Sequence, residues 1–154
     1  MTSLKRVILV LALFLSTAVY GGNAVPFQAS INTEIEPIGP CGPGCLTLQI
    51  TGSGNGLHFG QIEIDGPLQI NFATLAQRGA SALTAADGST LNILFTGSFV
   101  PGTVPEDATF SGTWTVVSGT KRFNDADGDG TYSGSASGPT GILNLAGTLS
   151  MGNR

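Results

Sequence analysis

The sequence predicts an all-β domain, an antiparallel barrel or sandwich, and three observations carry this prediction. Apolar and polar residues alternate with a period of two through most of the chain beyond residue 24, which indicates strands with one buried face. Asp-Gly pairs stand between several of these segments, as in tight hairpin turns. No window carries a convincing helical stripe of apolar residues. Many short strands without crossover helices are typical of antiparallel barrels and sandwiches.

The start of the chain has the layout of a secretory signal peptide. Two basic residues precede an apolar run over residues 7–19, and small residues stand at positions −3 and −1 of a cut after Ala24. We therefore predict a signal peptide over residues 1–24 and a single mature domain over residues 25–154, secreted or periplasmic. The alternative is an uncleaved anchor helix, for which the apolar run is short.

The two cysteines lie close together in "GPCGPGC". Because export leads to an oxidising compartment, we predict a Cys41–Cys45 disulfide. A redox motif is the alternative, but it sets two residues between its cysteines at a helix start, and here three intervene before a strand-like segment. Because this disulfide would close a very short loop, it should add little to the stability of the fold, and its main effect should be to fix the turn.

Each segment in which apolar and polar residues alternate is predicted to be a strand, and these segments follow one another along the chain. Apolar residues share one face in seven segments, at 27–35, 46–50, 62–64, 68–72, 91–99, 110–116 and 143–149. Turns are expected at the Asp-Gly pairs 65–66, 87–88 and 127–128, and loops at 51–56 and 100–107. Eight or nine strands result. Glycines inside the segments suit the bends of a small barrel better than a sandwich, namely Gly60, Gly97, Gly112, Gly134 and Gly147.

An aspartate run, Asp125, Asp127 and Asp129 followed by Gly130, has the opening spacing of a calcium loop. Position twelve of that loop needs a bidentate glutamate, and Ala136 stands there. The missing ligand favours a hairpin turn in which Asp and Gly supply the turn conformations, so no metal site is predicted. A shorter, weak calcium site built on the three aspartates is the alternative.

The segment "TWTVVSGTKRFNDADGDGTYSG", residues 113–134, resembles the shared segment of dirigent proteins and allene oxide cyclases. Six positions match that family's pattern: Gly119, Thr120, Arg122, Phe123, Ala126 and Gly128. Lys121 stands where a glycine is usual, and Asp127 stands where plant dirigent proteins carry arginine. The resemblance implies an eight-stranded antiparallel barrel that forms dimers or trimers. It also implies chemistry inside the barrel, by shaping a reactive substrate.

Charge and composition exclude several function classes. The mature chain has ten acidic and four basic residues, a net charge of −6, which argues against nucleic acid and against an anionic membrane surface as partners. His58 is the only histidine and has no triad or metal-ligand companions. The paired acids Glu34/Glu36 and Glu63/Asp65 oppose apolar faces, which predicts a solvated outer face.

These observations predict an exported barrel that binds a small apolar ligand in its lumen, with or without a cyclase-like or dirigent-like shaping effect. The lumen is expected to be lined by Phe27, Ile31, Phe72, Phe95, Phe110 and Trp114. No catalytic residue is assigned, no cofactor is predicted, and any enzymatic activity would be isomerase-like or cyclase-like. The alternatives are a structural or surface protein with a filled barrel and a weakly calcium-binding secreted domain.

Overall fold

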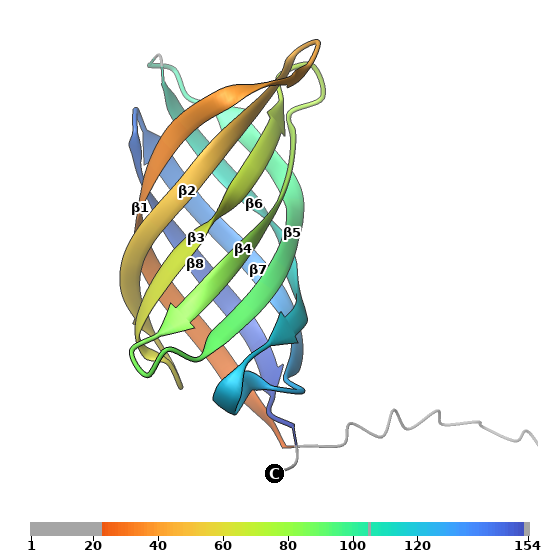
Figure 1. The fold of residues 1–154 in the computed structure, drawn as a ribbon. Coiled ribbons are helices and arrows are strands. Elements are labelled where there is room, and N and C mark those ends of the chain that lie inside the picture. Colours follow the sequence, from red (N-terminus) through yellow and green to blue (C-terminus); the bar gives the residue numbers. More distant parts are fainter. Residues whose placement is uncertain (1–22, 105, 153–154) are drawn as a thin grey trace, which may run out of the picture.

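Eight antiparallel strands form a closed barrel in the computed structural model, which describes residues 23–104 and 106–152. Each strand is hydrogen-bonded to the next along the chain, and β8 pairs with β1 to close the barrel (Figure 1). The strands are β1 (Ala24–Gly42), β2 (Cys45–Gly56), β3 (Gly60–Asn71), β4 (Ala76–Ala85), β5 (Thr90–Pro101), β6 (Asp107–Gly119), β7 (Asp127–Ser137) and β8 (Thr140–Ser150). One 3-10 turn occurs in the described part of the chain, η1 (Lys121–Phe123), between β6 and β7. No helix among the described residues has the length and apolarity needed to span a membrane.

The barrel has two different ends. The upper end in Figure 1 carries the β1–β2, β3–β4, β5–β6 and β7–β8 connections. The lower end carries the other three connections, together with η1 and both ends of the described chain. The predicted signal peptide, residues 1–24, lies outside the described residues except for its last two positions, and β1 begins at Ala24.

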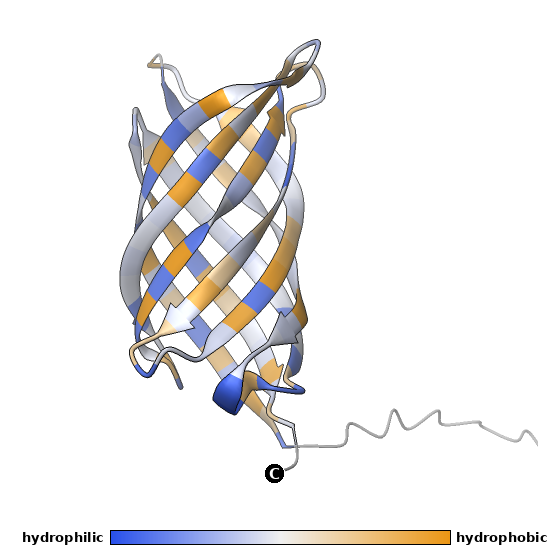
Figure 2. Cartoon of the chain, in the orientation of Figure 1, coloured by the Kyte–Doolittle hydropathy of each residue, from blue (hydrophilic) through white to orange (hydrophobic). Residues whose placement is uncertain are grey.

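The period-two alternation is confirmed along every strand. Inward positions are mostly apolar or glycine and outward positions are mostly Thr, Ser, Asn, Gln or charged, so orange and blue bands alternate along the ribbon in Figure 2. The apolar face therefore leaves water by facing the lumen, which is the main favourable term for folding such a barrel. Closure also removes the exposed strand edges that a low-charge sheet would otherwise present.

Three expected turns and loops are corrected by the structure. The pair Asp65-Gly66 lies in the middle of β3, not in a turn, and residues 51–56 form the end of β2, not a loop. The pair Asp127-Gly128 begins β7. The turn at Asp87-Gly88 is confirmed between β4 and β5, where Gly88 has a φ of +76°. The described residues therefore form eight strands.

The disulfide between Cys41 and Cys45 is present and joins the two sides of the β1–β2 hairpin. Its Cα atoms are 5.1 Å apart, which is an ordinary separation for such a bond. The bridge lies at the upper end of the barrel, so it fixes the turn where the long strands β1 and β2 meet.

Aromatic side chains fill the lower half of the barrel. The rings of Phe59 and Phe123 stack with centroids 4.4 Å apart, and Phe27 contacts both Phe59 at 5.2 Å and Trp114 at 5.5 Å. Phe27, Phe123 and Trp114 are almost fully buried, and Phe59 is buried as well. Since η1 brings Phe123 into this group, the connection between β6 and β7 closes the lower end.

Arg122 ties the lower-end connections together. Its guanidinium donates to the backbone carbonyl of His58 at 2.8 Å and lies over the ring of Phe123 at 4.6 Å. Its Nε lies 3.1 Å from Asp87 Oδ2, an ion pair rather than an aligned hydrogen bond. One side chain thus links the β2–β3, β4–β5 and β6–β7 connections.

Acid should weaken this lower-end link through Asp87. The backbone N–H of Ser89 donates to Asp87 Oδ1 at 2.9 Å and holds the pKa of that carboxyl below its ordinary value of 3.8, and Arg122 acts in the same direction. A carboxyl whose pKa is lower in the folded state stabilises the fold above its unfolded pKa, and this contribution is lost as the pH falls through the folded value. We expect acidification from about pH 5 to about pH 2.5 to lower the urea midpoint less in Asp87→Asn than in the unsubstituted protein.

Glu36→Gln is the matched control for this acid titration, because Glu36 is exposed on the outer face of β1. Its midpoint should fall with acid as steeply as that of the unsubstituted protein. Equal acid dependence in all three proteins would contradict the role given to Asp87.

Candidate functional site

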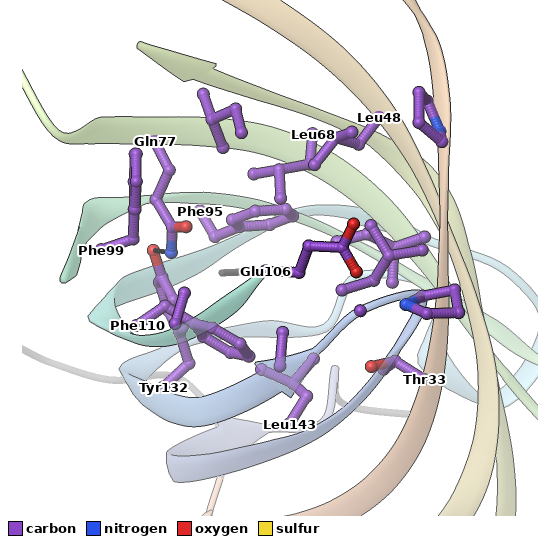
Figure 3. Close-up of a pocket in the computed structure, with 18 of the residues that line it drawn as sticks. Thr33, Leu48, Leu68, Gln77, Phe95, Phe99, Glu106, Phe110, Tyr132 and Leu143 are labelled. Carbon is purple, nitrogen blue, oxygen red and sulfur yellow. Dashed lines mark hydrogen bonds between the residues drawn. The ribbon is translucent and has the colours of Figure 1, made fainter. Parts of the chain in front are cut away.

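The upper half of the barrel encloses an open cavity of about 600 Å³. All eight strands and the β3–β4, β5–β6 and β7–β8 connections contribute to its wall. Most of the lining is apolar, with aliphatic side chains around the middle of the barrel, among them Ile35, Leu48, Ile50, Leu68, Ile70, Leu143 and Leu145. The rings of Phe95, Phe99 and Phe110 complete the wall on the side of β5 and β6 (Figure 3).

The cavity exists because large and small inward residues are distributed unevenly along the barrel. The lower half holds the cluster of Phe27, Phe59, Trp114 and Phe123. Near the upper end, by contrast, two facing inward positions on β6 and β7 are small, since Ala108 pairs with Ala136 and both line the cavity. An eight-stranded barrel is just wide enough to be filled by its side chains or to hold one small molecule. In this barrel the small pair at the upper end leaves space of the second kind, large enough for one small molecule.

One polar pair lies in the wall of the cavity. Gln77 Nε2 donates a hydrogen bond to the hydroxyl of Tyr132 at 2.6 Å, between β4 and β7 (Figure 3). Both side chains are buried, with exposed fractions of 6% for Gln77 and 4% for Tyr132. The Tyr132 ring packs edge-on against Phe95, with centroids 5.7 Å apart. Burial raises the pKa of Tyr132, so its hydroxyl stays protonated at neutral pH.

Acidic side chains stand at the mouth of the cavity. Glu106, in the β5–β6 connection, lines the cavity and has a φ of +73°, and its carbonyl accepts from the N–H of Gly138 at 3.2 Å. Its carboxylate extends over the cavity in Figure 3. Asp107 follows and accepts from the hydroxyl of Ser137 at 2.7 Å. The mouth therefore carries negative charge, and no Lys or Arg is among the described residues that line the cavity.

The predicted lumen residues divide between the two halves. Phe95 and Phe110 line the cavity, and Phe72 lies at its mouth, 56% exposed, against Phe99. Phe27, Ile31 and Trp114 instead belong to the packed core. The lumen is thus filled below and open above.

Sequence reasoning missed Gln77, Tyr132 and Glu106 as cavity residues. Gln77 could have been found from the alternation, because it shares the inward face of β4 with Leu83 and Ala85. Tyr132 likewise holds an inward position of β7, among glycines that hide the pattern. Glu106 lies in a connection, where no periodic signal exists.

The other candidate residues lie away from the cavity. His58 is in the β2–β3 connection at the lower end, with a φ of +68°. The paired acids Glu34/Glu36 and Glu63/Asp65 are exposed on the outer face, as predicted.

The aspartate run does not form a common site in the structure. Asp125 precedes β7 with a φ of +61°, whereas Asp127 and Asp129 lie on β7 itself. The expectation that all three lie in a hairpin turn is therefore wrong for Asp127 and Asp129. Among the described residues, no three His, Cys, Asp or Glu side chains gather closely enough to hold a metal ion.

Comparisons of this chain with models of protein families, with curated proteins and with solved structures found no match.

Proposed function

We propose that the protein is an exported binding barrel that holds one small apolar molecule in the upper half of its lumen. The observation that carries this proposal is the open apolar cavity of about 600 Å³. Pockets for small molecules have volumes of about 300–1,000 Å³ and are lined mainly by apolar and aromatic side chains with few polar groups. The cavity of this barrel has that size and that lining.

Physical chemistry favours an apolar occupant. Water needs several polar partners to fill a cavity, and an apolar wall offers few, so apolar cavities bind apolar molecules instead. A ligand that leaves water for this lumen gains about 25 cal/mol for each Å² of apolar surface removed from water. The wall is a closed sheet whose strands are all paired, so little ordering of the protein opposes binding.

We also propose that the barrel is of the dirigent and allene oxide cyclase type. The segment that carries this resemblance, 113–134, forms the lower part of β6, η1 and most of β7. Its matching residues Arg122 and Phe123 hold the lower end closed, so the resemblance concerns how the barrel is built. A shaping effect on a reactive ligand would come from the form of the cavity.

Export is part of the same proposal. The apolar run over residues 7–19 and the small residues before the cut after Ala24 support it. The disulfide between Cys41 and Cys45 supports it as well, because such bonds persist in oxidising compartments.

Titration with N-phenyl-1-naphthylamine, an uncharged apolar dye that fluoresces on leaving water, tests the proposal. We expect saturable binding of one dye molecule to the unsubstituted protein. The substitution Ala136→Phe places a ring among the small residues of the upper end and should weaken binding at least about tenfold.

The matched control is Ala146→Phe, because Ala146 is exposed on the outer face of β8. This variant should bind the dye as the unsubstituted protein does. Absence of saturable binding, or equal binding by Ala136→Phe, would exclude the cavity as a ligand site and favour a structural barrel.

A further inference from the structure

The hydrogen bond between Gln77 and Tyr132 does not use the Tyr132 hydroxyl proton, the second N–H of Gln77 or the amide oxygen of Gln77, so the pair still offers donors and an acceptor to a ligand. Gln77 Nε2 donates to the Tyr132 oxygen, so the hydroxyl proton of Tyr132 is not used in that bond. The amide oxygen Oε1 of Gln77 is likewise not used in it, and Figure 3 shows it turned toward the cavity. The pair can therefore donate to a carbonyl or hydroxyl oxygen and accept from a hydroxyl proton.

The pair is held in place by its surroundings. Tyr132 packs against Phe95 with ring centroids 5.7 Å apart and against Phe110 at 6.5 Å. Gly97 and Gly112 lie beside it on β5 and β6, and a Cβ at Gly112 would lie 2.7 Å from Tyr132 Cε1. Glycine at these positions leaves room for the tyrosine ring. The donor and acceptor are thus fixed before a ligand arrives, which lowers the entropy cost of binding one.

Charge restricts the ligand further. The pair is uncharged, and the two acidic residues that line the cavity, Glu106 and Asp107, are at its mouth. The described basic residues lie elsewhere: Arg78 is exposed on the outside of β4, and Lys121 and Arg122 are at the lower end. A ligand carboxylate would lose its hydration without gaining a countercharge, and the mouth would repel it.

We propose that the cavity selects an apolar molecule that carries one uncharged hydroxyl or carbonyl group, bound by the Gln77–Tyr132 pair. This inference rests on the proposed function, because it names the class of ligand for the same cavity. Fatty acids and other anionic amphiphiles are excluded from that class.

The test compares three nine-carbon probes that differ only in the terminal group, 1-nonanol, nonanoate and nonylamine, as competitors of N-phenyl-1-naphthylamine at pH 7. We expect nonanol to bind the unsubstituted protein most tightly and nonanoate to bind at least about tenfold more weakly. Tyr132→Phe should weaken nonanol binding about fivefold, the usual effect of one hydrogen bond. The dye should bind this variant within about twofold of its original affinity.

Gln77→Met is a second variant that removes the acceptor and should also weaken nonanol binding about fivefold. Gln61→Met is its matched control, because Gln61 is exposed at the lower end of β3, and it should leave the affinity unchanged. Dye affinity shows that each variant is folded with its cavity intact.

Two results would overturn the inference while leaving the proposed function standing. The first is dye binding together with a nonanol affinity that neither Tyr132→Phe nor Gln77→Met changes. The second is tightest binding by nonylamine that is lost in Glu106→Gln, which would assign the cavity to cations. If none of the probes and no dye binds, the proposed function itself fails.

Discussion

Replacing Trp114 with alanine should lower the free energy of unfolding by about 3–5 kcal/mol, the usual cost of deleting a buried large aromatic side chain. Trp114 is almost fully buried, and its ring contacts Phe27 edge-on with centroids 5.5 Å apart. Its indole N–H donates to the backbone carbonyl of Thr131 at 3.1 Å. The substitution removes the packing of the ring, leaves a void in the lower half, and frees a buried carbonyl.

Urea unfolding followed by circular dichroism measures this loss. Val117→Ala is the control on the same strand, since Val117 is 54% exposed on the outer face of β6, and it should change the stability by no more than about 0.5 kcal/mol. A loss below about 1 kcal/mol for Trp114→Ala would show that the lower half of the barrel is not the packed core described above.

The second large effect is expected at Gly147, where alanine should cost about 2–3 kcal/mol by overpacking. Gly147 faces inward on β8, opposite Gly130 on β7. A Cβ at this position would lie 2.7 Å from the Cα of Gly130 and 2.8 Å from Trp114 Cζ2. Neither neighbour can move freely, because one is backbone and the other belongs to the packed core.

Gly39→Ala provides the matched control, because no atom lies within 4 Å of a Cβ built at Gly39 on β1. This substitution should be neutral or slightly stabilising, since alanine restricts the unfolded chain more than glycine does. Should Gly147→Ala prove as neutral as Gly39→Ala, the close approach of β7 and β8 beneath Trp114 would be refuted.

The sequence predicted the structure best where the two-residue period of a strand alone decides which side chains are buried. Strict alternation predicted the inward faces, because burial in a barrel depends on the period of a strand and on little else. The hairpin rule for Asp-Gly pairs failed at Asp65-Gly66, because this pair lies within β3 and the alternation continues through it. There the inward Gly66 accommodates the close approach of β4, whose residue Ser81 would lie against any Cβ.

The cavity was harder to predict than the barrel. Its existence depends on which layers of the lumen receive large side chains, and this is set by strand register across the closed sheet. Phe27 and Phe110 belong to similar alternating segments, yet one lies in the packed core and the other lines the cavity. The Gln77–Tyr132 pair joins residues 55 positions apart, and only the closed barrel brings them together.

The central claim, that the upper half of this barrel is a ligand site, is tested most directly by methyl NMR with N-phenyl-1-naphthylamine. Addition of the dye should shift the methyl resonances of cavity residues such as Leu48, Leu68 and Leu143. The methyls of Leu94 and Ile142, which are exposed on the outer face, should keep their positions. Shifts confined to the outer methyls, or none at saturating dye, would contradict the account.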